Sequence, residues 1–370
     1  MYPPWIVDCP LCRIHHRLAP FQLPGMPSIA DMREWEVEFQ PPNCNAPVPI
    51  SGNPPMLRAS LHRILLETGI AMSRATVSSD PQAWFALFRY GQMFCHKSVG
   101  LEFRSDFLDL DFHLRGLAAD ELSNGIAYFI LREHYGLHHI SDVAPLIAKT
   151  NLNPQLRYVP GSQSEIKPDL FCEDATGHTV IAEVKGTATP YGKLKIKKGL
   201  EQVQNIEPIT KPLRGNCGRI VFGTHFKVDG EKKPGTTRTV IVDPPAEPGS
   251  PTDPASDEVI RHSYAKCFRF LGLNSLSDAI LLKSIIHHVE IGGTVDSPAG
   301  RVYPLAPGGE GLLFGIAQPV FNAILRHNNE NLFHAVSEAI RQLAEQSARV
   351  SDDGGYMLGN GIVVLPVGAI

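Results

Sequence analysis

The sequence predicts an α/β fold in which helices and strands alternate through the middle of the chain. A β-hairpin is expected over residues 167–185, where a short apolar segment and a nearly continuous apolar run flank a turn-like break at 173–178. One helix is expected before the hairpin, over 117–135, and another after it, over 195–206. A strand at 219–223 completes the order expected of a mixed sheet covered by helices.

The helix before the hairpin is predicted by its apolar spacing. Leu122, Ile126 and Phe129 recur at the interval of one helical face, and Gly136 is a natural C-terminal stop. The helix after the hairpin is rich in lysine at its start.

Charged residues interrupt the buried second strand of the hairpin. Side chains alternate along a strand, so Glu183 and Lys185 share one face while Val184 points to the other. Asp169 follows Pro168 at the start of the first strand. Two carboxylates one hairpin apart can hold Mg²⁺, with the Val184 carbonyl as a further oxygen. A lysine beside them can orient water and neutralise charge on a phosphate, which predicts metal-assisted phosphodiester hydrolysis.

The spacing of these residues resembles the PD-(D/E)XK nuclease superfamily, which includes restriction endonucleases, Holliday-junction resolvases and RecB-type nucleases. Pro168 and Asp169 are followed by thirteen residues and then by Glu183-Val184-Lys185. The resemblance implies a restriction-endonuclease-like αβββαβ core with a mixed sheet. It also implies that Asp169 and Glu183 bind Mg²⁺ or Mn²⁺ and that Lys185 assists the attacking water.

Two further residues match features of that superfamily. Gln202, in the helix after the hairpin, resembles a glutamine that follows the second motif, where it would orient Lys185 or contact substrate. Ile206 stands where the RecB-like form has tyrosine, and Gln204 is an alternative match. Glu121 resembles the helical acid that approaches the metal, with Asp120 as the adjacent alternative.

The remaining chain divides around this core. We expect an irregular or helical N-terminal region at 1–104, the nuclease-like domain at 105–243, a linker rich in Pro, Ser and acid at 244–257, and a mostly helical α+β domain at 258–370.

Local patterns suggest elements outside the core. Residues 55–68 have helical periodicity, 104–113 read as an extended lead-in, and 262–271, 277–288 and 315–347 look helical.

Composition predicts a soluble protein. Hydrophobic residues make up 43% of the 370, no apolar run reaches membrane-spanning length, and the N-terminus lacks signal-peptide order. Seven cysteines without regular pairing suit a reducing compartment. We therefore expect a cytoplasmic protein with no membrane partner.

Three cysteines near the N-terminus are candidate ligands of a structural Zn²⁺. Cys9 and Cys12 form a C-x-x-C pair and Cys44 follows later, but proline stands where a second pair would need its other thiol. Buried or incidental cysteines are the favoured interpretation.

Positive charge is concentrated around the hairpin. Residues 181–240 hold twelve Lys and Arg against five Asp and Glu, a net charge of +7, whereas the whole chain carries −4 and the remainder therefore −11. Contact with a phosphate backbone would require such a region, although a solvated helix start would also explain the lysines at 193–198.

These observations predict a Mg²⁺-dependent nuclease that acts on nucleic acid, with DNA favoured, in restriction or phage defence. A homodimer, or a protein partner in a defence system, would fit. The alternative is a non-catalytic nucleic-acid-binding or regulatory subunit of a multi-protein complex.

Overall fold

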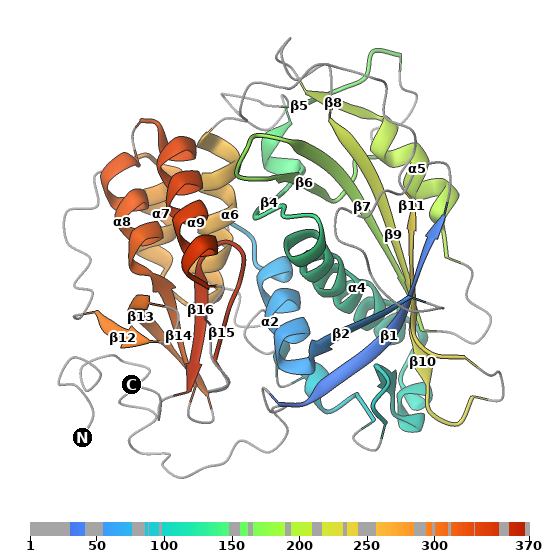
Figure 1. The fold of residues 1–370 in the computed structure, drawn as a ribbon. Helices are drawn as coiled ribbons and strands as arrows, with labels where there is room; N and C mark the ends of the chain where they lie inside the picture. Colours follow the sequence, from blue (N-terminus) through green and yellow to red (C-terminus); the bar gives the residue numbers. More distant parts are fainter. Residues whose placement is uncertain are drawn as a thin grey trace.

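A computed structural model places most of the chain. It describes residues 30–40, 55–75, 86–87, 89–95, 98–147, 156–161, 166–188, 194–208, 217–231, 235–242, 257–284, 294–297, 300–309, 312–328, 330–347 and 355–366. The fold is α/β, as expected, with a mixed sheet of seven strands beside a C-terminal part built on a second sheet (Figure 1).

The large sheet combines strands from distant parts of the chain. Its order is β2 (Met56–Ser60), β1 (Met32–Gln40), β11 (Arg238–Val242), β9 (Gly218–His225), β7 (Thr179–Thr187), β6 (Leu170–Glu173) and β4 (His139–Asp142). The pairs β1–β11 and β7–β9 are parallel, and the other neighbours are antiparallel. The parallel pair β7–β9 requires a crossover, which the helix between these strands provides.

The predicted hairpin is formed by β6 and β7. Leu170 pairs with Ala182 and Glu173 with Thr179. Asp174 closes the turn, because its Oδ1 accepts hydrogen bonds from the backbone N–H groups of Thr176 at 2.8 Å and His178 at 2.9 Å.

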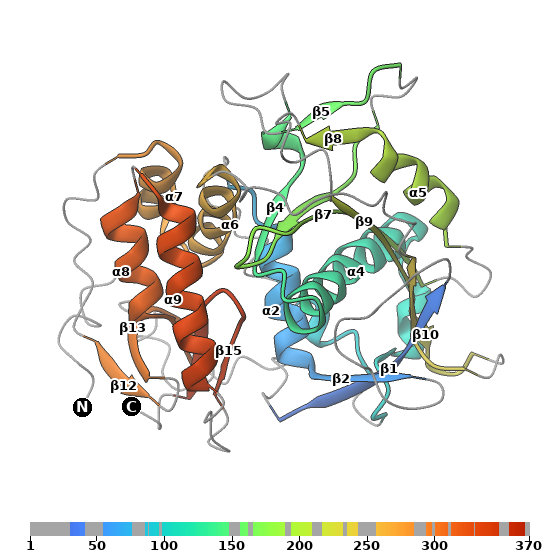
Figure 2. The same ribbon diagram turned by 45° about the horizontal axis from the view of Figure 1, so that its top comes forward.

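Helices cover both faces of this sheet (Figure 2). α4 (Phe112–His134) and α2 (Leu61–Met72) pack on one face, and α5 (Ile196–Gln204) packs on the other. α4 begins earlier than expected, with Asp111 as its N-cap accepting from His113 N at 2.8 Å. The extended lead-in expected at 104–113 is wrong, because η2 (Ser105–Asp109) and the first turn of α4 occupy it.

Two strands near the N-terminus correct the expectations for that region. In β1, buried Trp35 and Val37 alternate with glutamates, a period-2 pattern that indicates a strand with one buried face. The helix expected at 55–68 begins only after β2, where the Ser60 hydroxyl accepts from Arg63 N at 3.1 Å. Both strands belong to the sheet that contains the hairpin. Strands on either side of the domain boundary expected at residue 104 are therefore part of one sheet.

The C-terminal part forms a sheet with helices packed against it. Its strands, in order across the sheet, are β12 (Val295–Ser297), β13 (Gly300–Gly309), β14 (Leu312–Ala317), β16 (Ile362–Pro366) and β15 (Tyr356–Met357). Its helices are α6 (Asp257–Phe270), α7 (Asn274–Leu281), α8 (Gln318–His327) and α9 (Leu332–Ser347).

The helices of the C-terminal part agree only in part with the ranges predicted for them. One or two helices were expected at 315–347, and two are present, preceded by the end of β14. The helix expected at 277–288 already ends at Leu281. All but the last residue of the predicted linker at 244–257 lies outside the described residues.

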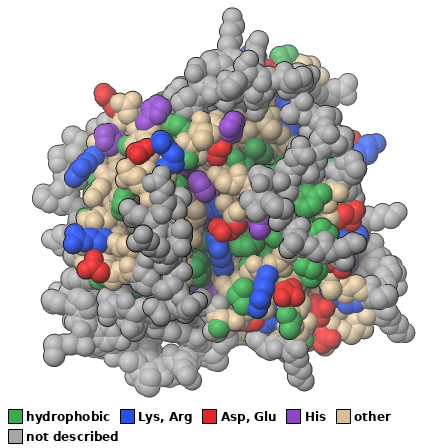
Figure 3. All heavy atoms as spheres, viewed as in Figure 1, with side chains coloured by type: hydrophobic (Ala, Val, Ile, Leu, Met, Phe, Trp, Pro, Cys, Tyr) green, Lys and Arg blue, Asp and Glu red, His purple; other side chains and the backbone are tan. Residues whose placement is uncertain are grey.

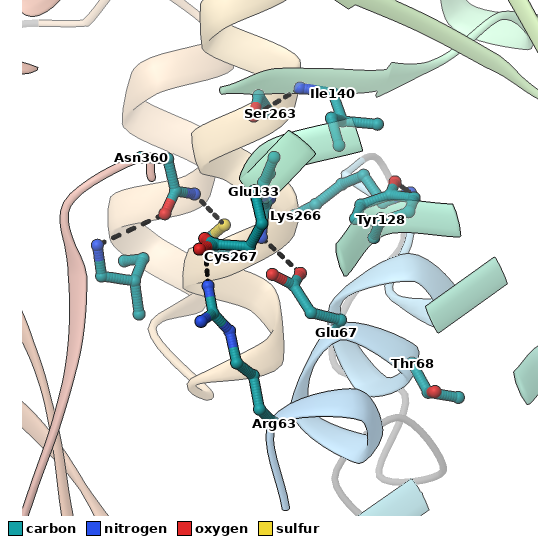
Figure 4. Close-up of polar contacts among 12 residues, drawn as sticks. Arg63, Glu67, Thr68, Tyr128, Glu133, Ile140, Ser263, Lys266, Cys267 and Asn360 are labelled. Atoms are coloured by element: carbon teal, nitrogen blue, oxygen red, sulfur yellow. Dashed lines mark hydrogen bonds and ion pairs between the residues drawn. The ribbon is translucent and has the colours of Figure 1, made fainter. Parts of the chain in front are cut away.

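α6 joins the C-terminal part to the large sheet. It lies along β4, the edge strand, and the Ser263 hydroxyl accepts a hydrogen bond from the backbone N–H of Ile140 at 3.2 Å. Figure 4 shows Ser263, Lys266 and Cys267 of α6 facing residues from other elements. α6 therefore covers an edge that would otherwise expose unpaired backbone groups.

Short elements complete the description. They are β3 (Glu102–Phe103) with β10 (Lys227–Val228), β5 (Leu156–Tyr158) with β8 (Ile206–Pro208), and η3 (Ala144–Leu146). None of the helices in the described ranges combines the length and apolar character needed to cross a membrane.

Candidate active site

The candidate site is built on the free end of β7. β6 begins opposite Ala182, so β7 continues beyond it with β9 as the neighbour on its other side. Val184 and Gly186 are two residues apart, which directs their N–H groups to the same edge of the strand. Asp169 Oδ2 accepts from Val184 N at 2.9 Å, and Asp120 Oδ1 accepts from Gly186 N at 3.0 Å. Two carboxylates therefore lie along this open edge.

The position of Asp120 depends on a close approach between α4 and β7. A Cβ atom on Gly186 would lie 2.2 Å from the Ala119 carbonyl oxygen and 2.5 Å from Ser123 Oγ. Only glycine allows the helix backbone to cross the strand at this distance.

Glu183 and Lys185 lie on the opposite face of β7, beneath α5. Glu183 is fully buried, and its Oε1 forms an ion pair with the Lys185 ammonium, which is 22% exposed. Gly199 of α5 lies directly over Glu183, because a Cβ there would be 3.4 Å from Glu183 Cγ. Among the described residues, Glu183 Oε2 is buried without a hydrogen-bond partner.

Burial and like charge raise the pKa values of these acids. Desolvation, followed by repulsion from Asp169, raises the pKa of Glu183 to about 8, although Lys185 opposes the shift. The Asp169 side chain is accessible to solvent, but partial desolvation also raises its pKa. The same cause raises the pKa of Asp120. Without a cation, Glu183 therefore tends to keep its proton at neutral pH, and a bound cation would favour its ionised form.

This arrangement fits a hard divalent cation. Mg²⁺ commonly binds proteins through one or two carboxylates and keeps several waters, so Asp169 and Glu183 are sufficient protein ligands. Glu183 Oε2 is buried, and its nearest acidic neighbour is Asp169, with which it shares the pKa shifts of the pair, so a cation could bind between the two carboxyls. No group of three or more His, Cys, Asp or Glu side chains suited to a metal occurs within the described ranges. The backbone N–H of Val184 donates to Asp169, so this residue lies beside the carboxylate, and its carbonyl as a further metal ligand stays a prediction.

The two acids of α4 point to different environments. Glu121 accepts a hydrogen bond from the Tyr90 hydroxyl, whereas Asp120 lies over the open edge of β7. The charges of Lys185 and Lys195 act on Asp120. Asp120, the alternative candidate for the helical acid, therefore lies at the site, whereas Glu121 contacts Tyr90.

Gln202 holds the segment that leads into Asp169. Its Nε2 donates to the Lys167 carbonyl at 3.0 Å, and Asn205 Nδ2 donates to the Ile166 carbonyl at 3.0 Å. Gln202 is buried and Gln204 is exposed, so Gln202 is the glutamine that contacts the site segment. Sequence reasoning missed Asn205, because a residue that ends a helix carries no signal of its distant partner.

The described basic surface is smaller than the charge count suggested. Lys195, Lys197 and Lys198 are exposed around the start of α5. Other members are engaged locally: Arg219 Nε donates to the Val203 carbonyl at 3.1 Å, and Arg238 pairs with Glu38 at 2.9 Å. On the face in Figure 3, coloured side chains of both charges are interspersed.

The other predicted ligands lie outside the described part of the chain. Cys9, Cys12 and Cys44, the candidate zinc ligands, all belong to ranges that the structure does not describe.

Comparison with known proteins adds no family to this picture. No protein-family model, no characterised protein and no solved structure matches the chain.

Proposed function

We propose that this protein is a metal-dependent nuclease with a restriction-endonuclease-like core, most consistent with DNA as its substrate. The order α4, β4, β6, β7, α5 and β9 follows the αβββαβ arrangement of that core. The antiparallel run β4–β6–β7 and the parallel pair β7–β9 support the same assignment.

One observation carries the proposal. Asp169 and Glu183, fourteen positions apart in sequence, interact at the free end of β7 together with Lys185, and a buried carboxylate oxygen there lacks a partner. Burying two acids side by side costs stability, as the raised pKa of Glu183 at about 8 indicates, and a bound cation would offset that cost.

Asp169 and Glu183 would hold the Mg²⁺ or Mn²⁺ ion, which when bound would stabilise charge that develops on the phosphodiester. The Lys185 ammonium, which pairs with Glu183, would orient water and neutralise charge on the attacked phosphate. Asp120 adds negative charge at the same edge. Gln202 and Asn205 act indirectly, because their hydrogen bonds fix the backbone before Asp169.

Cleavage assays test this function directly. Purified full-length protein would be incubated with plasmid, linear and single-stranded DNA and with RNA, in Mg²⁺, Mn²⁺ or EDTA. We expect metal-dependent cleavage that Asp169→Asn and Lys185→Met each reduce by roughly 10²- to 10³-fold. Lys283→Met is the matched control, since Lys283 also pairs with a glutamate, Glu258 at 2.8 Å, in the C-terminal part.

Metal binding distinguishes the nuclease from a binding subunit that kept the fold. Calorimetric titration with Mn²⁺ should show binding that Asp169→Asn abolishes. If metal binds but no substrate is cut, the catalytic proposal fails and the non-catalytic alternative replaces it.

A second pair of variants tests which acid of α4 belongs to the site. Asp120→Asn should lower metal affinity or cleavage by about 10- to 100-fold, because it removes charge at the open edge of β7. Glu121→Gln should leave both unchanged. If Glu121→Gln lowered metal affinity or cleavage and Asp120→Asn did not, Glu121 would be the acid of α4 that supports the metal.

A further inference from the structure

An apolar surface borders the candidate site on α4. Leu108, Phe112, Leu114 and Leu117 are exposed by 36%, 63%, 44% and 45%. They account for four of the seven large apolar side chains that are exposed within the described ranges. Leu108 precedes the helix in η2 and Leu114 lies on another side of it, so Phe112 and Leu117 are the apolar side chains on the side of α4 that carries Asp120.

This surface is continuous with the site. His113 and Leu117 precede Asp120 by seven and three residues, so all three lie on one face of the helix. The rings of Phe112 and His113 lie 5.8 Å apart in an edge-on arrangement. Between these side chains and the site, a Cβ on Gly116 would have no neighbour within 4 Å, which shows open space beside the helix.

Positive charge borders the site from the other face of the sheet, at the start of α5. Lys195, Lys197 and Lys198 are exposed there. Lys195 is close enough to Asp120 for its charge to oppose the rise in the pKa of that carboxyl. Lys195 and the apolar surface of α4 therefore border the same strand end from the two faces of the sheet.

The α4 wall itself is unsuited to phosphate. Asp109 and Asp111 are exposed near its start, and the guanidinium of Arg104 is paired with Asp106 at 2.6 Å. Arg115 lies five residues before Asp120, on a different side of the helix, but three residues after Phe112, whose outer side it borders. The acids at the start of α4 therefore disfavour phosphate more than they would if the arginine stood beside Asp120.

We propose that the site takes single-stranded nucleic acid, with its phosphates along the α5 lysines and its unpaired bases against Phe112, His113 and Leu117. A duplex presents phosphates on both of its strands, whereas a single strand can turn its phosphates to one side and its bases to the other. This inference rests on the proposed function, because it assigns the substrate class of the same site.

Binding measurements test the inference separately from catalysis. Fluorescence anisotropy would compare labelled single-stranded and duplex DNA, and single-stranded RNA, on the full-length Lys185→Met protein, which should not cut them. We expect the single strands to bind at least about tenfold more tightly than the duplex. Adding Phe112→Ala and Leu117→Ala should weaken single-strand binding by roughly tenfold or more and duplex binding much less. Leu282→Ala, which changes a 74% exposed leucine in the C-terminal part, should have no effect.

The outcomes separate this inference from the nuclease proposal. Equal or tighter duplex binding, or single-strand binding that ignores the α4 substitutions, would overturn the inference and assign the apolar surface to a protein partner. Cleavage of duplex alone would do the same while leaving the nuclease intact. Single-strand binding that depends on α4, without cleavage under any metal, would support the inference and overturn the nuclease.

Discussion

The two ends of helix α4 hold buried charge in opposite ways. Toward its C-terminal end, Arg132 forms an ion pair with Glu67 of α2, and both side chains are fully buried. Nearby, Lys266 of α6 donates to Asp142 Oδ1 at 2.5 Å, the Tyr128 hydroxyl at 2.9 Å and the Ala71 carbonyl at 3.0 Å. Figure 4 shows Glu67, Tyr128 and Lys266 together in this region. Each buried cation there has an acidic partner.

The N-terminal half of the helix borders a cluster without that balance. Asp120, Asp169 and Glu183 lie around Lys185, and the carboxylates have raised pKa values. The balanced cluster joins parts of the fold, whereas the unbalanced one lies at an accessible strand end. Desolvation also raises the pKa of Glu67, so the two clusters differ in the number of carboxylates for each cation and in access to solvent, not in burial.

The largest expected effect breaks the balanced cluster. Arg132→Met should lower the free energy of unfolding by about 3–5 kcal/mol, because it leaves the Glu67 carboxylate buried without its partner. Urea denaturation would measure the loss. Combining it with Glu67→Met should restore most of the stability, since two well-packed apolar side chains need no charge partner.

A second pair on the same helices provides the control. Arg63 and Glu133 also link α2 to α4, but their side chains are 15% and 32% exposed. Arg63→Met should cost less than Arg132→Met, because Glu133 keeps contact with solvent when its partner is removed, although Arg63 also loses its contacts with the Phe129 and Tyr356 rings. If the double variant at 67 and 132 were as unstable as the single one, lost packing rather than unpaired charge would explain the effect.

A smaller effect, with a distinctive pH dependence, is expected at the unbalanced cluster. The pKa of Glu183 is about 8 in the folded protein and 4.5 as its ordinary value. A raised folded pKa means that stability is fully present below 4.5 and falls as the pH rises through about 8. Without metal, the loss should be on the order of 2–4 kcal/mol. Glu183→Gln should remove this loss of folding stability between pH 4.5 and about 8.

Bound metal should reduce the stability that is lost when Glu183 ionises. Unfolding would be followed at pH 6 and pH 9 in EDTA and in MnCl₂. Bound cation should stabilise the wild type most at the higher pH and leave Glu183→Gln unchanged. Parallel pH profiles for the two proteins in EDTA would contradict the assignment of buried charge to Glu183.

The smallest expected effect is an acid loss at the join between the C-terminal part and the sheet. Desolvation lowers the pKa of His62 to about 4, and its Nδ1 lies 2.8 Å from the Tyr356 hydroxyl. A depressed histidine pKa means that stability falls as the pH drops from 6.5 toward about 4, because the unfolded chain binds the proton first. His62→Gln should flatten this loss of about 2–3 kcal/mol.

Urea denaturation at pH 7 and pH 5 would measure the acid effect. His327→Gln, at an exposed position on α8, should leave the profile unchanged. If both variants changed the pH dependence of stability equally, the loss at low pH would come from the net charge of the protein and not from the buried His62 ring.

Local patterns predicted the elements of the central sheet well. The hairpin, the two helices around it and the strand at 219–223 lie where their periodicities placed them, within a few residues at their ends. The same logic failed at 55–60, where a short strand directly precedes a helix and their apolar residues merge into one pattern. β1 carries a clear alternation of glutamates with apolar residues, which predicts a strand in a region expected to be irregular or helical.

By itself, the sequence determined the local chemistry: a strand that places Glu183 and Lys185 on one face, and a turn that brings Asp169 back toward them. These features depend on backbone periods and turns over fewer than twenty residues. Only the tertiary structure decided that Asp120 rather than Glu121 reaches the site, that β1 extends the same sheet, and that α6 covers the edge strand. Those outcomes depend on how elements far apart in the chain pack together, such as the close approach of α4 to Gly186, which no local pattern encodes.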